Sequence, residues 1–118
     1  MIVLFENHKT SFLLKMNTQG IEEMLKYIED GSIKSKIQIP IIHLRQERKL
    51  TIKIDADIDE MLIHKDEIEL YMDEEELAYF YERLCHAFTN NCFYPAEVCE
   101  RKYQNQYVTI YCDTIPFG

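Results

Sequence analysis

Residues 55–76 read DADIDEMLIHKDEIELYMDEEE, and this stretch combines the change from strand to helix with most of the chain's net negative charge. It holds eleven of the chain's 21 acidic residues but only one, Lys65, of its 13 basic residues. The formal net charge of −8 is therefore concentrated here, and the rest of the chain is close to neutral. A field concentrated in this way attracts a basic partner and raises its rate of association.

The second half of this stretch predicts a strand followed directly by a helix. In residues 67–72 every second side chain is apolar and is expected to face inward, and the residues between them face outward. This is the period of a half-buried strand. Asp73 takes the N-cap position of the helix, and Glu76, three residues later, completes a capping box. Helical spacing of apolar residues on an inner face continues towards Asn90, through Leu77, Phe80, Tyr81, Leu84, Cys85 and Phe88.

Upstream of this stretch, residues 2–5 and 11–16 predict a first hairpin, and a helix follows it. Asn17 and Thr18 offer its N-cap, and its apolar face consists of Ile21, Met24, Leu25 and Ile28. We expect Gly31 to end this helix in the left-handed C′ position, where glycine is favoured.

The middle of the chain predicts an antiparallel pair of strands. Residues 33–41 and 50–54 alternate with period two, and residues 46–49 form a charged turn between them. Pro40 has no N–H for a sheet ladder, so it indicates a sheet edge or a β-bulge. Residues 31–54 also carry six basic residues against one acidic residue, so a basic stretch precedes the acidic one.

The C-terminal third predicts two more strands, residues 98–103 and 106–112, joined near Gln104 and Asn105. The resulting order of elements is β-β-α-β-β-β-α-β-β. Because strands and helices do not alternate regularly, the predicted class is α+β, an antiparallel or mixed sheet with two helices packed on one face. A length of 118 residues suits a single domain that spans residues 1–118.

The composition is that of an ordinary globular protein, with 47% hydrophobic and 29% charged residues. No apolar run approaches the roughly 20 residues of a membrane-spanning helix, and the N-terminus lacks the basic region of a signal peptide. We therefore expect a cytoplasmic protein with no membrane partner. The negative charge argues against nucleic-acid binding, which needs clustered Lys and Arg side chains.

Metal sites find little support in the sequence. Asp55, Asp57 and Asp59, with Asp66 in the twelfth place, resemble part of a calcium-binding loop, but Glu60 stands where that loop requires glycine. The absence of a C-x-x-C pair argues against zinc. Reduced, buried and inert thiols are therefore expected at Cys85, Cys92, Cys99 and Cys112.

Catalytic residues are also not indicated. Cys85 and His86 are neighbours on a helix, so their side chains diverge by about 100° and do not pair. Three other histidines are isolated in the sequence: His8, His43 and His64. No phosphate-binding loop, dinucleotide-binding glycine pattern, metalloprotease motif or nucleophile elbow occurs. We therefore expect no catalytic residue, no cofactor and no enzymatic activity.

These exclusions leave a binding protein whose partner has a basic surface. The acids of residues 55–60 have no local structural explanation, and Tyr79 is an aromatic residue expected on the outer face of the second helix. Tyrosine is enriched at interface hot spots. The predicted partner-binding residues are Asp55, Asp57, Asp59, Glu60, Asp66, Glu67, Glu69 and Tyr79.

A small, acidic, single-domain α+β chain without catalytic motifs resembles the bacterial toxin-immunity proteins. The resemblance is one of architecture and charge over the whole chain, and it carries over no individual residue. It implies a non-catalytic inhibitor that neutralises a cognate toxin, a nuclease in many cases, by covering its basic active-site cleft with acidic residues.

Three alternatives stay open at this point. A DNA-mimicking inhibitor of a nuclease would share the same electrostatics. A structural or regulatory subunit of an oligomeric assembly would instead use a sheet edge or the C-terminal strands, and the sequence leaves the oligomeric state undetermined. An active site built from scattered residues without a motif is the third alternative.

Overall fold

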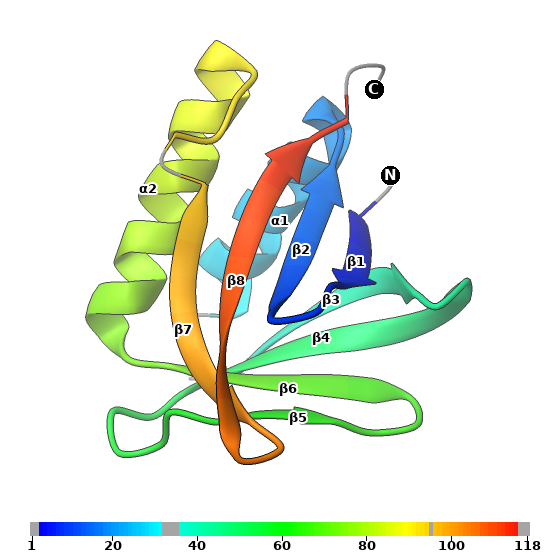
Figure 1. Cartoon of the computed structure of the whole chain (residues 1–118). Coiled ribbons are helices and arrows are strands. Elements are labelled where there is room, and N and C mark those ends of the chain that lie inside the picture. Colours follow the sequence, from blue (N-terminus) through cyan, green and yellow to red (C-terminus); the bar gives the residue numbers. More distant parts are fainter. Residues whose placement is uncertain (1–2, 32–35, 95, 116–118) are drawn as a thin grey trace.

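The computed structural model describes residues 3–31, 36–94 and 96–115, which form one eight-stranded sheet and two helices (Figure 1). The strands are β1 (Val3–Asn7), β2 (Ser11–Met16), β3 (Lys36–His43), β4 (Gln46–Ile54), β5 (Met61–Ile63), β6 (Glu67–Met72), β7 (Glu97–Tyr103) and β8 (Gln106–Thr114). The helices are α1 (Thr18–Gly31), after β2, and α2 (Glu74–Asn90), after β6. The predicted α+β class and order of elements are confirmed, with one short additional strand, β5. Residue 2 and residues 33–35, which we expected in strands, lie outside the described residues.

Four antiparallel hairpins make up this sheet, in the order β5-β6-β4-β3-β1-β2-β8-β7. Parallel pairing joins the hairpins to one another, between β6 and β4, β3 and β1, and β2 and β8. The sheet curls until its two edges nearly meet. Glu60, just before β5, forms a bridge with Lys102 on β7, and the Lys102 N–H donates to the Asp59 carbonyl at 2.8 Å. The sheet is therefore a nearly closed barrel.

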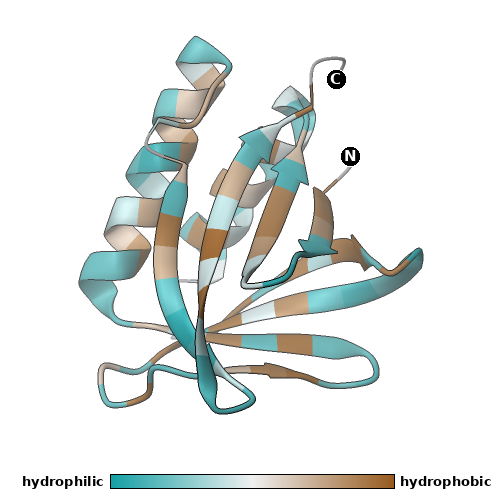
Figure 2. Cartoon of the chain, viewed as in Figure 1, coloured by the Kyte–Doolittle hydropathy of each residue, from teal (hydrophilic) through white to brown (hydrophobic). Residues whose placement is uncertain are grey.

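Both helices pack against this sheet and against each other, and they enclose one hydrophobic core with it (Figure 1). Alternate residues of β2 and β6, and of most of β3, are buried, and brown apolar bands interrupt the teal and white ones along the strands in Figure 2. Burial of each large apolar side chain contributes about 1.5–3 kcal/mol to stability. The largest fully buried side chains include those of Phe5, Leu14, Ile39, Leu50 and Phe80.

The inner face of α2 differs from the prediction at its C-terminal end. Leu77, Phe80 and Leu84 are buried as predicted, but Phe88 is 45% exposed. Ala87, three residues after Leu84, takes the buried position instead, because that spacing also lies on the core-facing stripe of the helix.

Polar side chains cap both helices at the predicted residues. The Asn17 Oδ1 accepts a hydrogen bond from the Gly20 N–H at 2.7 Å, which satisfies one of the free N–H groups of α1. At α2 the capping box is complete, since the Asp73 side chain accepts from the Glu76 N–H at 2.7 Å and the Glu76 side chain accepts from the Asp73 N–H at 3.1 Å. These local bonds explain why the caps could be predicted from the sequence.

The turn between β3 and β4 lies earlier than predicted. Residues 46–49 belong to β4, and the chain turns at Leu44 and Arg45, which have φ values of 52° and 63°. The predicted turn at Gln104 and Asn105 has the same left-handed backbone and is confirmed. Two-residue turns of this kind match the twist of the strands but usually contain Asn-Gly, so Leu-Arg carries no sequence signal.

The prediction of a sheet edge or a bulge at Pro40 is wrong. β3 is an interior strand, and its pairing with β4 is continuous. Pro40 lies opposite Lys49, whose N–H points away from β3 and donates to the Asp66 carbonyl at 3.1 Å. The proline nitrogen therefore also faces away from β4. On that side the described part of β1 pairs only with Ile42 and His43, so the missing N–H costs no described ladder bond.

Gly31 does not adopt the predicted left-handed C′ conformation. It is the last residue of α1, and it has no positive φ. A Cβ atom at this position would lie 2.7 Å from the Ile37 Cγ1 atom and 3.0 Å from the Ile37 Cα atom. Glycine is therefore required because α1 and β3 approach each other closely, and not because of a turn.

Replacement of Gly31 by alanine should destabilise the protein. Gly→Ala in a helix usually stabilises it by about 0.5–1 kcal/mol, but here overpacking against Ile37 should reverse the sign and cost about 1–3 kcal/mol. Urea unfolding of G31A measures this, with K26A on the exposed face of α1 as a near-neutral control. A G31A variant as stable as the wild type would contradict the close approach.

Candidate functional site

The predicted partner-binding acids do not form one patch. Residues 55–60 connect β4 with β5 and lie beside the N-terminus of α2, whereas Asp66 precedes β6 at the other end of the same strands. β4 and β6 run parallel, from Lys49 beside Glu67 to Ile54 beside Met72. The two groups of acids are thus separated by six residues of strand, which is roughly 20 Å.

We call the first group, together with Glu74 and Glu75 of the first turn of α2, the acidic end of the molecule; Glu76 of the same turn is not part of it, because it pairs with Arg101. A shallow hollow joins the two segments, and its lining includes Ile54, Asp55, Ala56 and Glu74. Within the described residues, no ion pair involves any of these acids. The acidic end consists of Asp55, Asp57, Asp59, Glu60, Glu74 and Glu75.

Hydrogen bonds hold the loop of the acidic end in place. The Asp55 Oδ1 accepts from the Asp57 N–H at 2.9 Å, a turn that aspartate often stabilises. The Tyr107 hydroxyl on β8 donates to the Asp59 Oδ2 at 3.0 Å, and this bond raises the pKa of Tyr107. Asp59 thus has a structural role, while Asp57 and Glu60 are exposed with their carboxylates in no described hydrogen bond.

The acids of β6 are instead matched by the bases of β4. The Glu69 carboxylate lies 3.4 Å from the Lys53 Nζ and 3.3 Å from the His64 Nε2, and it accepts a hydrogen bond from the Tyr71 hydroxyl at 3.2 Å. Although burial opposes its charge, the attraction of Lys53 outweighs this effect and lowers the pKa of Glu69. Glu67 lies beside Lys49 in the strand register. The parallel β4–β6 pairing thus places the basic stretch against this half of the acidic one.

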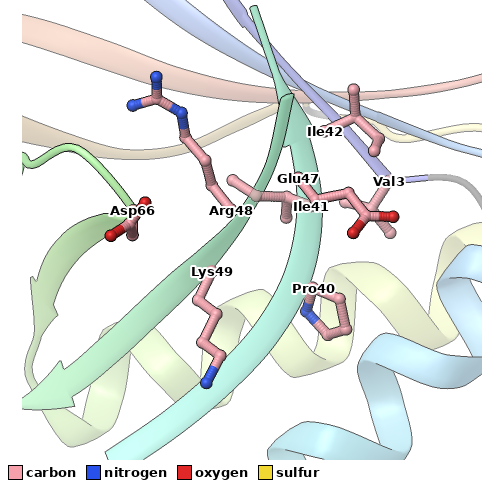
Figure 3. Close-up of a pocket in the computed structure, with 8 residues that line it drawn as sticks. All are labelled: Val3, Pro40, Ile41, Ile42, Glu47, Arg48, Lys49 and Asp66. Carbon is pink, nitrogen blue, oxygen red and sulfur yellow. The ribbon is translucent and has the colours of Figure 1, made fainter. Parts of the chain in front are cut away.

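Asp66 belongs to a hollow of mixed charge on the outside of β3 and β4 (Figure 3). Figure 3 shows Arg48 and Lys49, neighbours on β4, pointing to opposite sides of the strand. Arg48 donates to the His64 carbonyl at 3.0 Å and to the Gln46 side chain at 3.2 Å. Acidic and basic residues both line this hollow, so it lacks the uniform charge of the acidic end.

Tyr79 lies on the exposed side of α2, as predicted, with 36% of its surface accessible. The Arg83 guanidinium lies 5.3 Å from the centre of its ring, a cation–π contact along the helix surface. Arg83 also donates to the Tyr94 carbonyl. Tyr79 is thus held by a neighbouring base, and its predicted contact with a partner stays a prediction.

Arg101 is a central residue that the sequence did not reveal. Its buried guanidinium donates from Nε to the Tyr71 carbonyl at 2.5 Å, donates to the Glu100 carbonyl, and forms an ion pair with Glu76. Burial opposes the charge, but the hydrogen bond to Glu76 holds the pKa of Arg101 above its ordinary value. We call these contacts the Arg101 clasp. The one sequence feature that indicates its burial is its spacing along β7. Arg101 is two residues from both Cys99 and Tyr103, so it shares their inward face.

Removal of the guanidinium should strongly destabilise the protein. R101M leaves the Glu76 carboxylate and the Tyr71 carbonyl without their partner, which should cost about 3–5 kcal/mol. E76Q keeps an acceptor for the cap and should cost less. Denaturant unfolding measures both changes, and K102M, at the exposed neighbouring position, serves as the control. Equal stability of R101M and K102M would show that the clasp is unimportant.

His43 is buried at the end of β3. Its Nε2 lies 2.8 Å from the Asn7 Oδ1, its ring contacts Phe5 edge-on, and its Nδ1 has no hydrogen-bond partner within the described residues. Burial, with a smaller contribution from the positive charge of Arg48, lowers the pKa of His43. The other two histidines that we considered lie near acids, His8 beside Glu6 and His64 beside Glu69.

The lowered pKa of His43 makes stability depend on pH. Protonation favours the unfolded chain, so the stabilisation is complete above the ordinary pKa of 6.5 and is lost as the pH falls towards the folded value. Between pH 7.5 and 5, the wild type should lose more stability than H43Q, by up to about 1.4 kcal/mol per pH unit. Urea unfolding at both pH values measures this, with H8Q as the exposed control. Parallel losses in all three proteins would contradict the assignment.

The cysteines are all free thiols, in three environments. Cys99 and Cys112 are buried as predicted, and burial raises the pKa of Cys99 to about 12 and that of Cys112 further. Cys85 is half-buried, and the prediction of a buried thiol is wrong for Cys92, which is exposed in the loop after α2. Among the described residues, no three His, Cys, Asp or Glu side chains come together as a metal site would require.

No protein-family model matches the chain, and no curated protein sequence matches it either. Neither helix of the described residues has the length and apolar character needed to span a membrane. Indications of a function therefore come from the charge and geometry of the chain itself.

Proposed function

We propose that this chain is a non-catalytic inhibitor that binds a basic protein surface through its acidic end. In this proposal it acts in the cytoplasm as an immunity protein and neutralises a cognate toxin, a nuclease by class. One observation supports the proposal: among the described residues, bases of the same chain pair with some of the acids and not with others. Glu69 has three partners within the chain, whereas the acids of the acidic end form no described ion pair and leave their field available to another molecule.

The acidic end is suited to cover a cleft that binds nucleic-acid phosphates. Its carboxylates carry the same charge as phosphates and would compete for the same Lys and Arg side chains. The Lys102 N–H already holds the loop backbone at the Asp59 carbonyl, and the Tyr107 hydroxyl holds the Asp59 side chain, so binding would order few additional groups. Such preorganisation reduces the entropic cost of association.

The geometry narrows the residues that we propose for contact. Asp55, Asp57 and Glu60 remain, and Glu74 and Glu75 join them from the first turn of α2. The carboxylates of Asp59 and Glu69 are held by side chains of other elements, whereas that of Asp55 accepts, within the described residues, only from the Asp57 N–H in its own loop. Asp66 and Glu67 lie at the other end of the strands. Tyr79, along the same helix as Glu75, would contact the edge of the partner.

A second candidate function is a subunit of an oligomeric assembly. One observation favours it, the exposure of Leu44 at the tip of the β3–β4 hairpin. This side chain is 63% exposed and sits on left-handed backbone, which is rare for leucine. Strained backbone of this kind clusters at functional sites. A stable oligomer of the isolated chain would support this alternative.

Co-expression with the product of the adjacent open reading frame tests the proposed function. We expect that product to arrest growth by nucleic-acid cleavage and this chain to restore growth. The triple variant D57K/E60K/E75K should lose protection, and its association should slow by about tenfold or more at low salt and by less at high salt.

The matched control is E22K/E47K/E97K, which changes the net charge equally at exposed positions elsewhere. It should protect as the wild type does. A harmless neighbouring product that does not bind, or equal protection by the two triple variants, would contradict the proposal.

A further inference from the structure

A second hollow adjoins the acidic end, in the groove between α1 and α2. Its volume is about 440 Å³, and its floor is apolar, formed by Ile28, Leu77 and Ile54. Ala78 contributes only a methyl group to its wall, so the face of α2 is open at this point. Ile54 and Glu74 line both this groove and the hollow of the acidic end, so the two are continuous.

A hydrogen bond between the helices holds one side of the groove. The Tyr81 hydroxyl on α2 donates to the Glu29 Oε1 on α1 at 2.5 Å. This bond raises the pKa of Tyr81 to about 12. A hydrogen bond thus joins the two helices at the wall of the groove.

The rims of the groove are acidic on both sides. Glu74 stands on the α2 side, and Glu29 stands on the α1 side with Asp30 next to it. The last turn of α1 contains no basic residue, although the helix dipole disfavours acids there. The acids of this turn thus oppose helix stability, while they add to the negative field around an apolar floor.

We infer that this groove receives one large apolar side chain of the partner, flanked by Lys or Arg residues that meet the acidic rims. The inference rests on the proposed function, since it names the chemistry of the segment that the same acidic end attracts. Interface hot spots are usually large side chains in desolvated pockets, surrounded by contacts that exclude water. Charge complementarity selects a cationic segment, and the floor selects its apolar residue.

Two synthetic peptides test this inference on the full chain. Both are twelve residues long with the same number of Lys and Arg residues, and they differ only in a central Phe or Ser. Titration calorimetry should show the Phe peptide binding at least about tenfold more tightly than the Ser peptide. Chemical shifts in the wild type should change at Ala78 and Tyr81 only with the Phe peptide.

Two variants separate the groove from the charge. A78L fills the groove without a change of charge, and it should remove the advantage of the Phe peptide but leave the Ser peptide unaffected. T89L, on the same helix away from the groove, is its control, and the melting temperatures confirm that both fold. D57K/E60K should weaken the two peptides equally.

Each contrary outcome has a distinct meaning. Equal binding of the two peptides, with no effect of A78L, overturns the groove and leaves the proposed function intact. Binding that responds to A78L but not to D57K/E60K contradicts the role of the acidic end. No binding of either peptide overturns the inference. Self-association of the wild type that R45E abolishes would assign the groove to the Leu44–Arg45 hairpin of a second copy.

Discussion

The buried guanidinium of Arg101 connects the parts of the chain on which the rest of the structure depends. It reaches from β7 to the carbonyl of Tyr71 at the end of β6, and its charge meets Glu76 in the capping box of α2. One side chain thus links the last hairpin, the middle strands and the start of a helix. A buried cation is stable only when it has such partners. The Arg101 contacts therefore help to close the sheet, and they can form only in the closed sheet.

Closure of the sheet also shapes the acidic end. As β7 approaches β5, the Lys102 N–H reaches the Asp59 carbonyl and the Tyr107 hydroxyl reaches the Asp59 side chain. The loop is therefore ordered by backbone and neutral groups, and within the described residues no base forms an ion pair with its carboxylates. The β4–β6 pair has the opposite arrangement, because Lys53 lies against Glu69. One acidic stretch of sequence thus becomes two surfaces with different electrostatic properties.

The site could be predicted only in part, for a physical reason. The concentration of acids is a property of the sequence, and Asp55, Asp57 and Glu60 do lie together because they are close in the chain. The parallel register of β4 and β6 decided which acids form ion pairs with bases of the chain, and no local sequence pattern encodes that register. The groove between α1 and α2 joins residues about 50 positions apart, and no sequence signal indicated it.

Local interactions explain what the sequence by itself determined about this protein. The capping box at Asp73 and Glu76, the cap at Asn17 and the strands at residues 11–16 and 67–72 depend on residues within a few positions of one another, so they were predicted correctly. Other features depend on distant neighbours. Gly31 is required by Ile37 on β3, Pro40 is accommodated where β1 does not pair with it in the described residues, and Arg101 turns inward to Glu76. The tertiary structure alone decided these, because close approach, sheet order and burial of a charge arise only when the whole sheet has curled.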